Sequence, residues 1–431
     1  MPIAENAHQP ETRDKQSRRS LLVQCAAGTI ASVWGANVAA QSAGGAASSG
    51  NRIVLPPTAA PTEAPEKTPE PADGPSRRVG FALVGFGHLT LERLMPAFGH
   101  SKHCKPVALV SGDRDKALKL ARQHDIKESA VYDYQNFDRI AQNPEVEVVY
   151  IVLPNSMHAE FTVRAARAGK HVLCEKPMAV SERECVQMID ACRAANRKLM
   201  VAYRTQYEPL ARAVRKMVVD KQLGTLKEFI STNSQNMGTP DQWRLKKALA
   251  GGGALPDIGL YCLNTVRFLS DEEPNEVMGW TDSTPGDARF REVEENVHFT
   301  LRFPSGLRAT CHSSYGAHKS QMFRLMGSDG WAELDPGFAY EGNRMRHSRR
   351  VGERVVVSEP TIPIKDQFAL EMDHMAQCVR DDKTPYSTGE DGLQDQRIIE
   401  AIYASAKANG KPISLKVPAT AVRGPEPDEA G

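Results

Sequence analysis

One lysine, one aspartate and one tyrosine have the side chains and the spacing that acid–base chemistry needs. Lys176 closely follows a short apolar run, residues 171–174, and Pro177 restricts the backbone of the lysine. Asp257 and Tyr261 lie four residues apart, so at the start of a helix they share one face. A phenol has a reference pKa of about 10, and a neighbouring ammonium would lower it and make Tyr261 a credible base or acid. The three residues also fit plainer roles, namely an exposed strand-end lysine, a helix N-cap and a core tyrosine.

The first predicted strand leads into a pair of glycines. Residues 79–84 are apolar, Gly85 and Gly87 follow, and the next residues predict a helix with an apolar face. Such a strand, glycine turn and helix form the opening of a dinucleotide-binding unit, where backbone N–H groups and the helix dipole meet a pyrophosphate. Thr90 stands where a third small residue is usual, so this motif alone is weak evidence.

The end of the second predicted strand, residues 106–110, concerns the choice between NAD and NADP. An acidic residue there would bind the ribose 2′-hydroxyl of NAD and repel a phosphate. Ser111 comes first after the strand and Lys116 is close behind, which favours the 2′-phosphate of NADP. Asp113 leaves NAD open, because a slightly different register would make it the NAD-selecting acid. Lys116 also fits a solvated helix position.

The remaining strands of the N-terminal part extend this pattern. Residues 146–153, 171–174 and 198–202 are further apolar strands that alternate with helices, which predicts a doubly wound parallel sheet. Their C-terminal tips then open on one edge, where such sheets bind ligands. We therefore predict a Rossmann dinucleotide-binding domain over residues 77–203.

The pattern changes after Arg204. Strand-like runs joined by turn signals predict a large, mainly antiparallel sheet with one face for the site and one available for subunit contact. These runs are residues 226–232, 276–280, 296–303, 307–313 and 323–326, and helices are predicted at 210–219, around 263–269, at 366–380 and at 390–408. The predicted fold class is α/β, with an α+β substrate and oligomerisation domain over residues 204–416 and a flexible tail over 417–431.

The first 76 residues predict export. A twin-arginine pattern, Arg18-Arg19, precedes an apolar run that glycines and polar residues interrupt, so we expect a twin-arginine signal peptide over residues 1–40 and no stable membrane anchoring. The twin-arginine translocase would be a partner during export to the periplasm. Residues 41–76 are rich in proline and predict an extended arm or linker.

The overall composition excludes several other functions. Positive and negative charges balance to +1, which gives no reason to expect nucleic acid as a partner. The eight cysteines include no CxxC pair and no His/Cys cluster at metal-ligand spacing, so no metal site is predicted.

Three motifs make the chain recognisable. Residues 153–161, residues 169–178 with Glu175-Lys176-Pro177, and the glycine-rich residues 251–261 resemble the glucose–fructose oxidoreductase/inositol dehydrogenase (Gfo/Idh/MocA) family. The resemblance runs from about residue 77 to residue 412. It is strongest to the periplasmic glucose–fructose oxidoreductase branch, because the third motif ends in Tyr261 where many other members carry His.

The resemblance implies a set of site residues. Catalysis would fall to Lys176 and Tyr261 with Asp257 in support, and Tyr207 and Tyr261 would contact the substrate. Cofactor contacts would be Gly85, Gly87, Ser111, Lys116, Pro154, Asn155, His158, Glu175, Lys176, Arg204, Trp243 and Arg244. His158 also fits a packed helix-start histidine, and Arg244 an exposed ion-pair partner.

Export and a nicotinamide requirement together predict the type of enzyme. The periplasm should hold little free NADP, so we expect tightly bound NADP, oxidation of an aldose to its lactone and reduction of a ketose or second aldose to a polyol by ping-pong hydride transfer. The resemblance implies a homo-oligomer, a dimer or tetramer, that exchanges its N-terminal arms. Two alternatives stay open: an NAD-assisted glycosidase of the same family and a non-catalytic, cofactor-bound sugar sensor.

Overall fold

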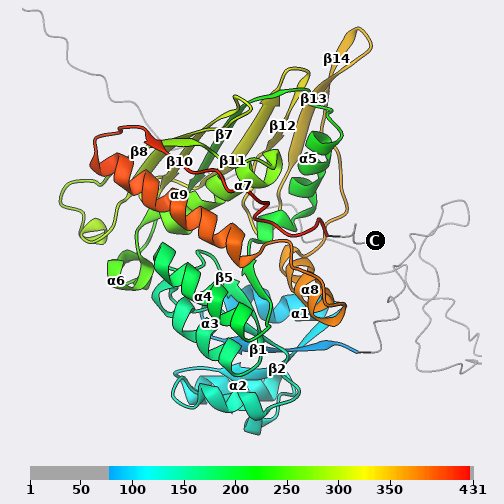
Figure 1. The fold of residues 1–431 in the computed structure, drawn as a ribbon, viewed down its shortest axis with the longest axis vertical. Coiled ribbons are helices and arrows are strands. Elements are labelled where there is room, and N and C mark those ends of the chain that lie inside the picture. Colours follow the sequence, from blue (N-terminus) through cyan, green and yellow to red (C-terminus); the bar gives the residue numbers. More distant parts are fainter. Residues whose placement is uncertain (1–76, 428–431) are drawn as a thin grey trace, which may run out of the picture. The chain divides into compact units, whose positions relative to one another are not determined.

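The protein, seen here in a computed structural model that describes residues 77–427, is built on two β-sheets (Figure 1). The predicted signal peptide (1–40), the proline-rich segment (41–76) and the last four residues lie outside the described part. Among the described helices, none has the length and the apolar character needed to cross a bilayer.

The first sheet has six parallel strands in the order β3-β2-β1-β4-β5-β6. The order reverses direction between β1 and β4, which is the position where doubly wound sheets bind ligands. Every residue of β4 and β6 is buried, as expected of a parallel sheet covered on both faces. The predicted Rossmann sheet is confirmed, with strands β1 Val79–Val84, β2 Cys104–Val110, β3 Val131–Tyr132, β4 Val148–Ile151, β5 His171–Glu175 and β6 Leu199–Ala202.

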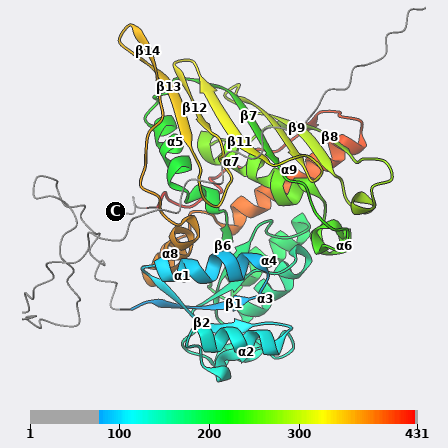
Figure 2. The same cartoon turned by 180° about the vertical axis from the view of Figure 1, so that it is seen from behind.

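Helices cover both faces of this sheet (Figure 2). On one face lie α3 (His158–Arg167) and α4 (Glu182–Ala194), and on the other lie α1 (Met95–His100) and α8 (Gln367–Arg380), while α2 (Arg114–Gln123) packs beside β2 and β3. Helix α8 comes from the C-terminal part of the chain. Helix α8 therefore packs on the first sheet although it lies after the predicted boundary at residue 203.

The second sheet has nine strands in the order β14-β13-β12-β11-β7-β10-β9-β8-β15. Only β7 and β10 pair in parallel, so the prediction of a large, mainly antiparallel sheet is confirmed. The strands are β7 Leu226–Ser234, β8 Glu276–Asp282, β9 Asn296–Arg302, β10 Arg308–Ser314, β11 Ser320–Gly327, β12 Gly330–Leu334, β13 Met345–Val351, β14 Arg354–Ser358 and β15 Ile413–Ser414. The sequence did not predict β12 to β15, since they are short or, in β13, polar on both faces.

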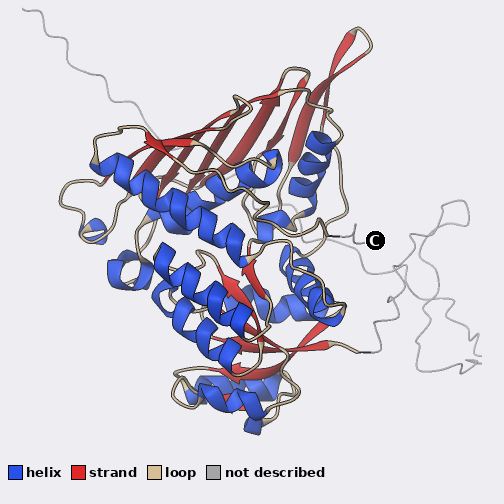
Figure 3. Cartoon of the chain, in the orientation of Figure 1, coloured by secondary structure: helices blue, strands red, loops and turns tan. Residues whose placement is uncertain are grey.

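One face of the second sheet is covered and the other is open. Helices α5 (Pro209–Val219), α7 (Leu260–Ser270) and α9 (Gly389–Lys407) lie against the covered face (Figure 3). Along β7 the buried Phe229 alternates with the exposed Ile230, as a sheet with one covered face requires. In both views the described helices leave the opposite face bare.

The C-terminal tail, predicted to be loose, is docked as far as it is described. Arg423 donates to the backbone oxygen of Arg267 at 2.8 Å and forms an ion pair with Asp391 at 3.2 Å. Arg267 is itself fully buried and pairs with Asp391 and Asp395. The prediction of a flexible tail is wrong for residues 417–427, because Arg423 reaches acidic partners that composition alone does not reveal.

Replacing Arg423 by Gln is expected to lower the free energy of unfolding by about 2 kcal/mol, because it removes one of the two cations that pair with the buried carboxylate of Asp391. Urea denaturation of the full chain measures the loss. The control is Arg350→Gln in the exposed part of β13, which should change the free energy by about 0.5 kcal/mol or less. Equal midpoints for the two variants would contradict the docking of the tail.

Candidate active site

The central contact of the site joins the first sheet to the helix layer under the second. Lys176 follows β5 directly, and Asp257 lies in a π-helical turn, Leu255–Gly259, that leads into α7. The Nζ of Lys176 is 2.9 Å from Oδ1 of Asp257 and 2.8 Å from its backbone oxygen. The two side chains are only 12% and 14% exposed. The structure therefore joins these two predicted site residues in one buried ion pair.

The glycine-rich motif places Asp257 through one half-buried carboxylate, that of Glu294. Glu294 accepts the backbone N–H of Gly253 at 2.9 Å and that of Leu255 at 3.0 Å. A Cβ at Gly253 would come within 2.1 Å of the Glu294 backbone oxygen, so only glycine fits there. The motif thus serves close packing around the turn that carries Asp257.

Asp257 is saturated with donors on its second oxygen as well. Its Oδ2 accepts from Arg244 Nε at 3.1 Å and from the hydroxyl of Tyr315 at 2.6 Å. Burial opposes ionisation of this carboxyl, but Lys176 and Arg244 outweigh it and lower the pKa of Asp257 below its ordinary value. The alternative role as a helix N-cap is wrong, because the side chain bonds to Lys176, Arg244 and Tyr315.

Tyr315 is a site residue that the sequence analysis missed. It follows β10, is fully buried, and its pKa is raised by burial and by Asp257. A tyrosine after a polar strand end carries no motif. Only the fold, which sets the end of β10 beside the turn of Asp257, brings it to the site.

Lys176 is charged in this environment. Burial works against the ammonium, but Asp257, Tyr261 and Glu175 together raise the pKa of Lys176 above its ordinary value. Its Nζ lies 4.7 Å from the centre of the Tyr261 ring, a cation–π contact with the ring face and not with the hydroxyl. Lys176 therefore cannot serve as a base near neutral pH; it supplies positive charge.

The hydroxyl of Tyr261 is bonded to Arg204. The Nε of Arg204 donates to this hydroxyl at 3.1 Å, and the guanidinium also donates to the side chain of Gln367 and to the backbone oxygen of Phe338, both at 2.7 Å. Arg204 is buried in the 3-10 turn after β6. The prediction of Arg204 as a cofactor contact needs correction, since its donors are occupied by protein groups and it positions Tyr261.

The glycine loop has the geometry that a dinucleotide pyrophosphate needs. Gly85 has a φ of 95°, and a Cβ there would lie 2.3 Å from the backbone oxygen of Val152. At Gly87 a Cβ would meet no atom within 4 Å, so the outer side of the loop is open to a ligand. Thr90, at the unusual third position, is buried and donates its hydroxyl to the Gly85 oxygen at 2.8 Å. The residues present therefore fit the cofactor that the motif implies.

The residues predicted to select the cofactor lie beside this loop. Strand β2 ends at Val110, so Ser111 is the first residue after it, as predicted. Asp113 accepts the backbone N–H of Lys116 at 3.0 Å and thereby caps α2. The Nζ of Lys116 reaches the backbone oxygen of Phe86 within the glycine loop at 2.5 Å.

The other predicted cofactor residues lie at the tip of β4 and in the turn before α6 (Lys247–Ala250). Asn155, next to Pro154 at the tip of β4, donates from Nδ2 to the backbone oxygen of Ala250 at 2.8 Å and ties this tip to α6. Trp243 and Arg244 share the 3-10 turn Trp243–Leu245, with the guanidinium 4.5 Å from the indole centre. Arg244 is therefore an ion-pair partner of Asp257, at 36% exposure.

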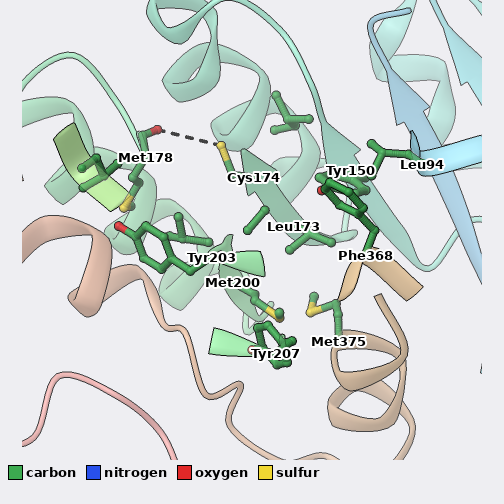
Figure 4. Close-up of a cluster of buried hydrophobic side chains, with 14 of the residues drawn as sticks. Leu94, Tyr150, Leu173, Cys174, Met178, Met200, Tyr203, Tyr207, Phe368 and Met375 are labelled. Carbon is green, nitrogen blue, oxygen red and sulfur yellow. Dashed lines mark hydrogen bonds between the residues drawn. The ribbon is translucent and has the colours of Figure 1, made fainter. Parts of the chain in front are cut away.

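Two predicted ligand residues are structural. His158 is fully buried, and its ring nitrogens lie 2.9 Å from the backbone oxygens of Leu153 and Pro177, so it joins the segments that follow β4 and β5. Tyr207 lies in the core near Met200 and Met375 (Figure 4), and its hydroxyl bonds to Ser387 at 3.1 Å. Both predictions are corrected, because one sequence does not distinguish a buried polar ring from one that lines a site.

Comparison with known proteins identifies the family of this chain. The family model described as oxidoreductase family, NAD-binding Rossmann fold, matches residues 79–203, and that of the GFO/IDH/MocA C-terminal domain matches residues 211–333. The D-xylose 1-dehydrogenase (NADP(+)) of Haloarcula marismortui is 34% identical over 335 residues, which cover 76% of this chain and 91% of that protein.

Solved structures give the same result. The aldose-aldose oxidoreductase of Caulobacter crescentus is 42% identical, with a TM-score of 0.76 over 79% of this chain and all of that chain. Levoglucosan dehydrogenase in complex with NADH shares the fold at 21% identity and a TM-score of 0.69, over 79% of this chain and all of that one. The chain therefore belongs to the Gfo/Idh/MocA family and is an oxidoreductase with an NAD(P)-binding Rossmann domain.

Proposed function

We propose that the chain is a sugar oxidoreductase that uses NADP and oxidises a CH–OH group of an aldose. The observation that carries this proposal is the arrangement around Tyr261, whose ring contacts the Lys176 ammonium while its hydroxyl is held by Arg204. This group lies at the tips of the nucleotide-binding strands. The similarity to a xylose dehydrogenase and to an aldose-aldose oxidoreductase supports a sugar as the substrate class.

The side chains divide the proton chemistry between them. Lys176, kept charged by Asp257, orients and polarises the reacting sugar oxygen. Tyr261, acting as its phenolate, takes the proton of the sugar hydroxyl during oxidation, and as the phenol it returns that proton during reduction. Arg204 stabilises the negative charge that arises on the tyrosine oxygen. What a bound nicotinamide supplies is reversible acceptance of a hydride.

The position of three residues near the glycine loop supports NADP over NAD. Ser111 and Lys116 supply a hydroxyl and an ammonium at the end of β2, groups that a 2′-phosphate can use. The carboxylate of Asp113, which could have selected NAD, instead caps α2. The relative from Haloarcula marismortui carries NADP(+) in its name, in agreement with this preference.

We extend the proposal to export and to a cofactor that does not leave. The twin-arginine pattern supports the periplasm as the location, since that route transports folded proteins with their cofactors. Because free NADP should be scarce there, the enzyme would oxidise one sugar to a lactone and reduce another to a polyol with the same bound NADP, in ping-pong order.

The open face of the second sheet supports a homo-oligomer. It exposes large apolar side chains, including Ile230, Trp280 and Val355. A second copy would cover them, and the proline-rich arm, residues 41–76, would extend this contact.

The protein recovered from the periplasmic fraction of its native host is expected to release NADP when denatured. Glucose added to the intact protein should produce nicotinamide absorbance at once, and a ketose or second aldose should remove it without added nucleotide. The same preparation should sediment as a dimer or tetramer.

Three results would count against parts of this proposal. Recovery from the cytoplasm alone would contradict export, and a single-chain mass would contradict the oligomer. A preparation that contains no nicotinamide and ignores added NADP and NAD would contradict the function as a whole.

Replacing Tyr261 by Phe should slow nicotinamide reduction by glucose about a hundredfold while leaving the bound nucleotide in place, because only the proton acceptor is lost. The matched control is Tyr207→Phe, which removes a hydroxyl in the core and should keep the rate within about threefold. Stopped-flow absorbance measures both. The role of Tyr261 would be refuted by two variants with equal rates.

A further inference from the structure

A chain of three polar side chains runs through the core of the first sheet, behind the catalytic lysine. The hydroxyl of Tyr150 in β4 lies 2.9 Å from Oε1 of Glu175 at the tip of β5 and 3.3 Å from Oε1 of Glu371 in α8. Tyr150 and Glu371 are fully buried. Figure 4 shows Tyr150 among apolar neighbours that include Leu173 and Phe368. The proposed acid–base chemistry at Tyr261 does not use this chain.

Counting protons shows that the two carboxyl groups cannot both be ionised. The hydroxyl of Tyr150 has one proton, so it can donate to only one of the two carboxyl oxygens within reach. The other contact would bring the tyrosine oxygen and a carboxylate oxygen together without a proton between them. One of the two carboxyl groups must therefore carry a proton and donate it to Tyr150.

The surroundings decide which carboxyl group this is. Glu175 also accepts the backbone N–H of Lys176 at 3.2 Å on Oε2. Burial raises the pKa of Glu175, but this hydrogen bond and the nearby cations of Lys176 and Arg204 oppose the rise. The second oxygen of Glu371, Oε2, is buried without a hydrogen-bond partner. An unpaired carbonyl oxygen of a neutral acid costs far less than an unpaired oxygen of a buried carboxylate.

We propose that Glu371 is a neutral carboxylic acid in the folded protein and donates to Tyr150, which in turn donates to Glu175. The chain then has one direction and one negative charge, on Glu175 next to Lys176. Glu371 is thus a positioning residue that acts through Tyr150 and Glu175 on the backbone of the catalytic lysine. This inference goes beyond the proposed function, and its spectroscopic test does not depend on that function.

The groups that face Glu371 agree with this assignment. They are Tyr150 from β4, Glu175 from β5, Arg204 from the turn after β6 and Tyr207 just beyond it. Burial and Glu175 raise the pKa of Glu371 well above its ordinary value, against the weaker effects of Tyr150 and Arg204. A carboxyl with a raised pKa in the folded state stabilises the fold at low pH, and this contribution is lost as pH rises above the ordinary glutamate range.

Infrared difference spectroscopy of the full-length holoenzyme tests the proposal directly. The spectrum of the wild type at pH 7 should contain one C=O stretching band of a neutral carboxylic acid that is absent from the spectrum of Glu371→Gln. The matched control is Glu333→Gln, a buried glutamate paired with Arg324 and Arg346, which should remove carboxylate bands only. Loss of carboxylate bands in Glu371→Gln, with no acid band, would overturn the proposal.

Two further measurements decide the matter should Glu371→Gln fold poorly. In Tyr150→Phe the acid band should remain and shift in frequency, because its acceptor is gone; an absent acid band would overturn the assignment. In Glu175→Gln the acid band of Glu371 should also persist, whereas its loss would mean that Glu175 carries the proton.

The positioning role has its own readout. Gln at position 371 can still donate to Tyr150, so Glu371→Gln should keep nicotinamide reduction within about threefold of the wild type. Glu371→Leu removes the donor and should lose about tenfold. The stability of the wild type should also fall relative to that of Glu371→Gln as pH rises from acid to neutral. Equal rates for the Leu and Gln variants would overturn the positioning role.

Discussion

The ion pair between Lys176 and Asp257 is the interaction on which the site depends. It links a strand tip of the parallel sheet to the helical turn under the antiparallel sheet, so one contact sets both the charge and the relative position of the groups proposed to act in catalysis. Burying two charges is costly unless every polar atom finds a partner. Here Arg244 and Tyr315 donate hydrogen bonds to the second oxygen of the carboxylate, so both oxygens of Asp257 have partners and the ion pair is held in place.

Several surrounding elements each help to position the residues of this ion pair and of the site around it. The glycine-rich turn packs against Glu294 and places Asp257. His158 contacts the segments that follow β4 and β5 and holds them together. Arg204 holds the hydroxyl of Tyr261 from the next strand tip. Behind Lys176, the chain through Tyr150 leaves a single negative charge close to the lysine backbone. Charge placement in this site is thus a property of the sheet core as much as of its edge.

The sequence could predict those features of the fold and of the site that are determined by neighbouring residues along the chain. The apolar strands, the glycine turn and the choice of Lys176, Asp257 and Tyr261 as candidate site residues follow from hydrophobic runs and from short motifs. Tyr315, the true partner of Arg204 and the neutral role inferred for Glu371 depend on neighbours far away in the chain. Tyr207 was assigned to the site and Arg423 to a loose tail for the same reason, since burial is a tertiary property. Strands such as β13, polar on both faces, carry no alternation that a sequence could reveal.

A double-mutant cycle on Lys176 and Asp257 tests most directly whether the two side chains act as one unit. The rates of glucose-driven nicotinamide reduction are compared for the wild type, Lys176→Met, Asp257→Asn and the double variant. If the two side chains act as one unit, each single variant should lose nearly as much activity as the double variant. The activity loss of the double variant should then be at least tenfold smaller than the product of the two single losses. Losses that multiply independently would contradict the account, because Asp257 would then act without Lys176.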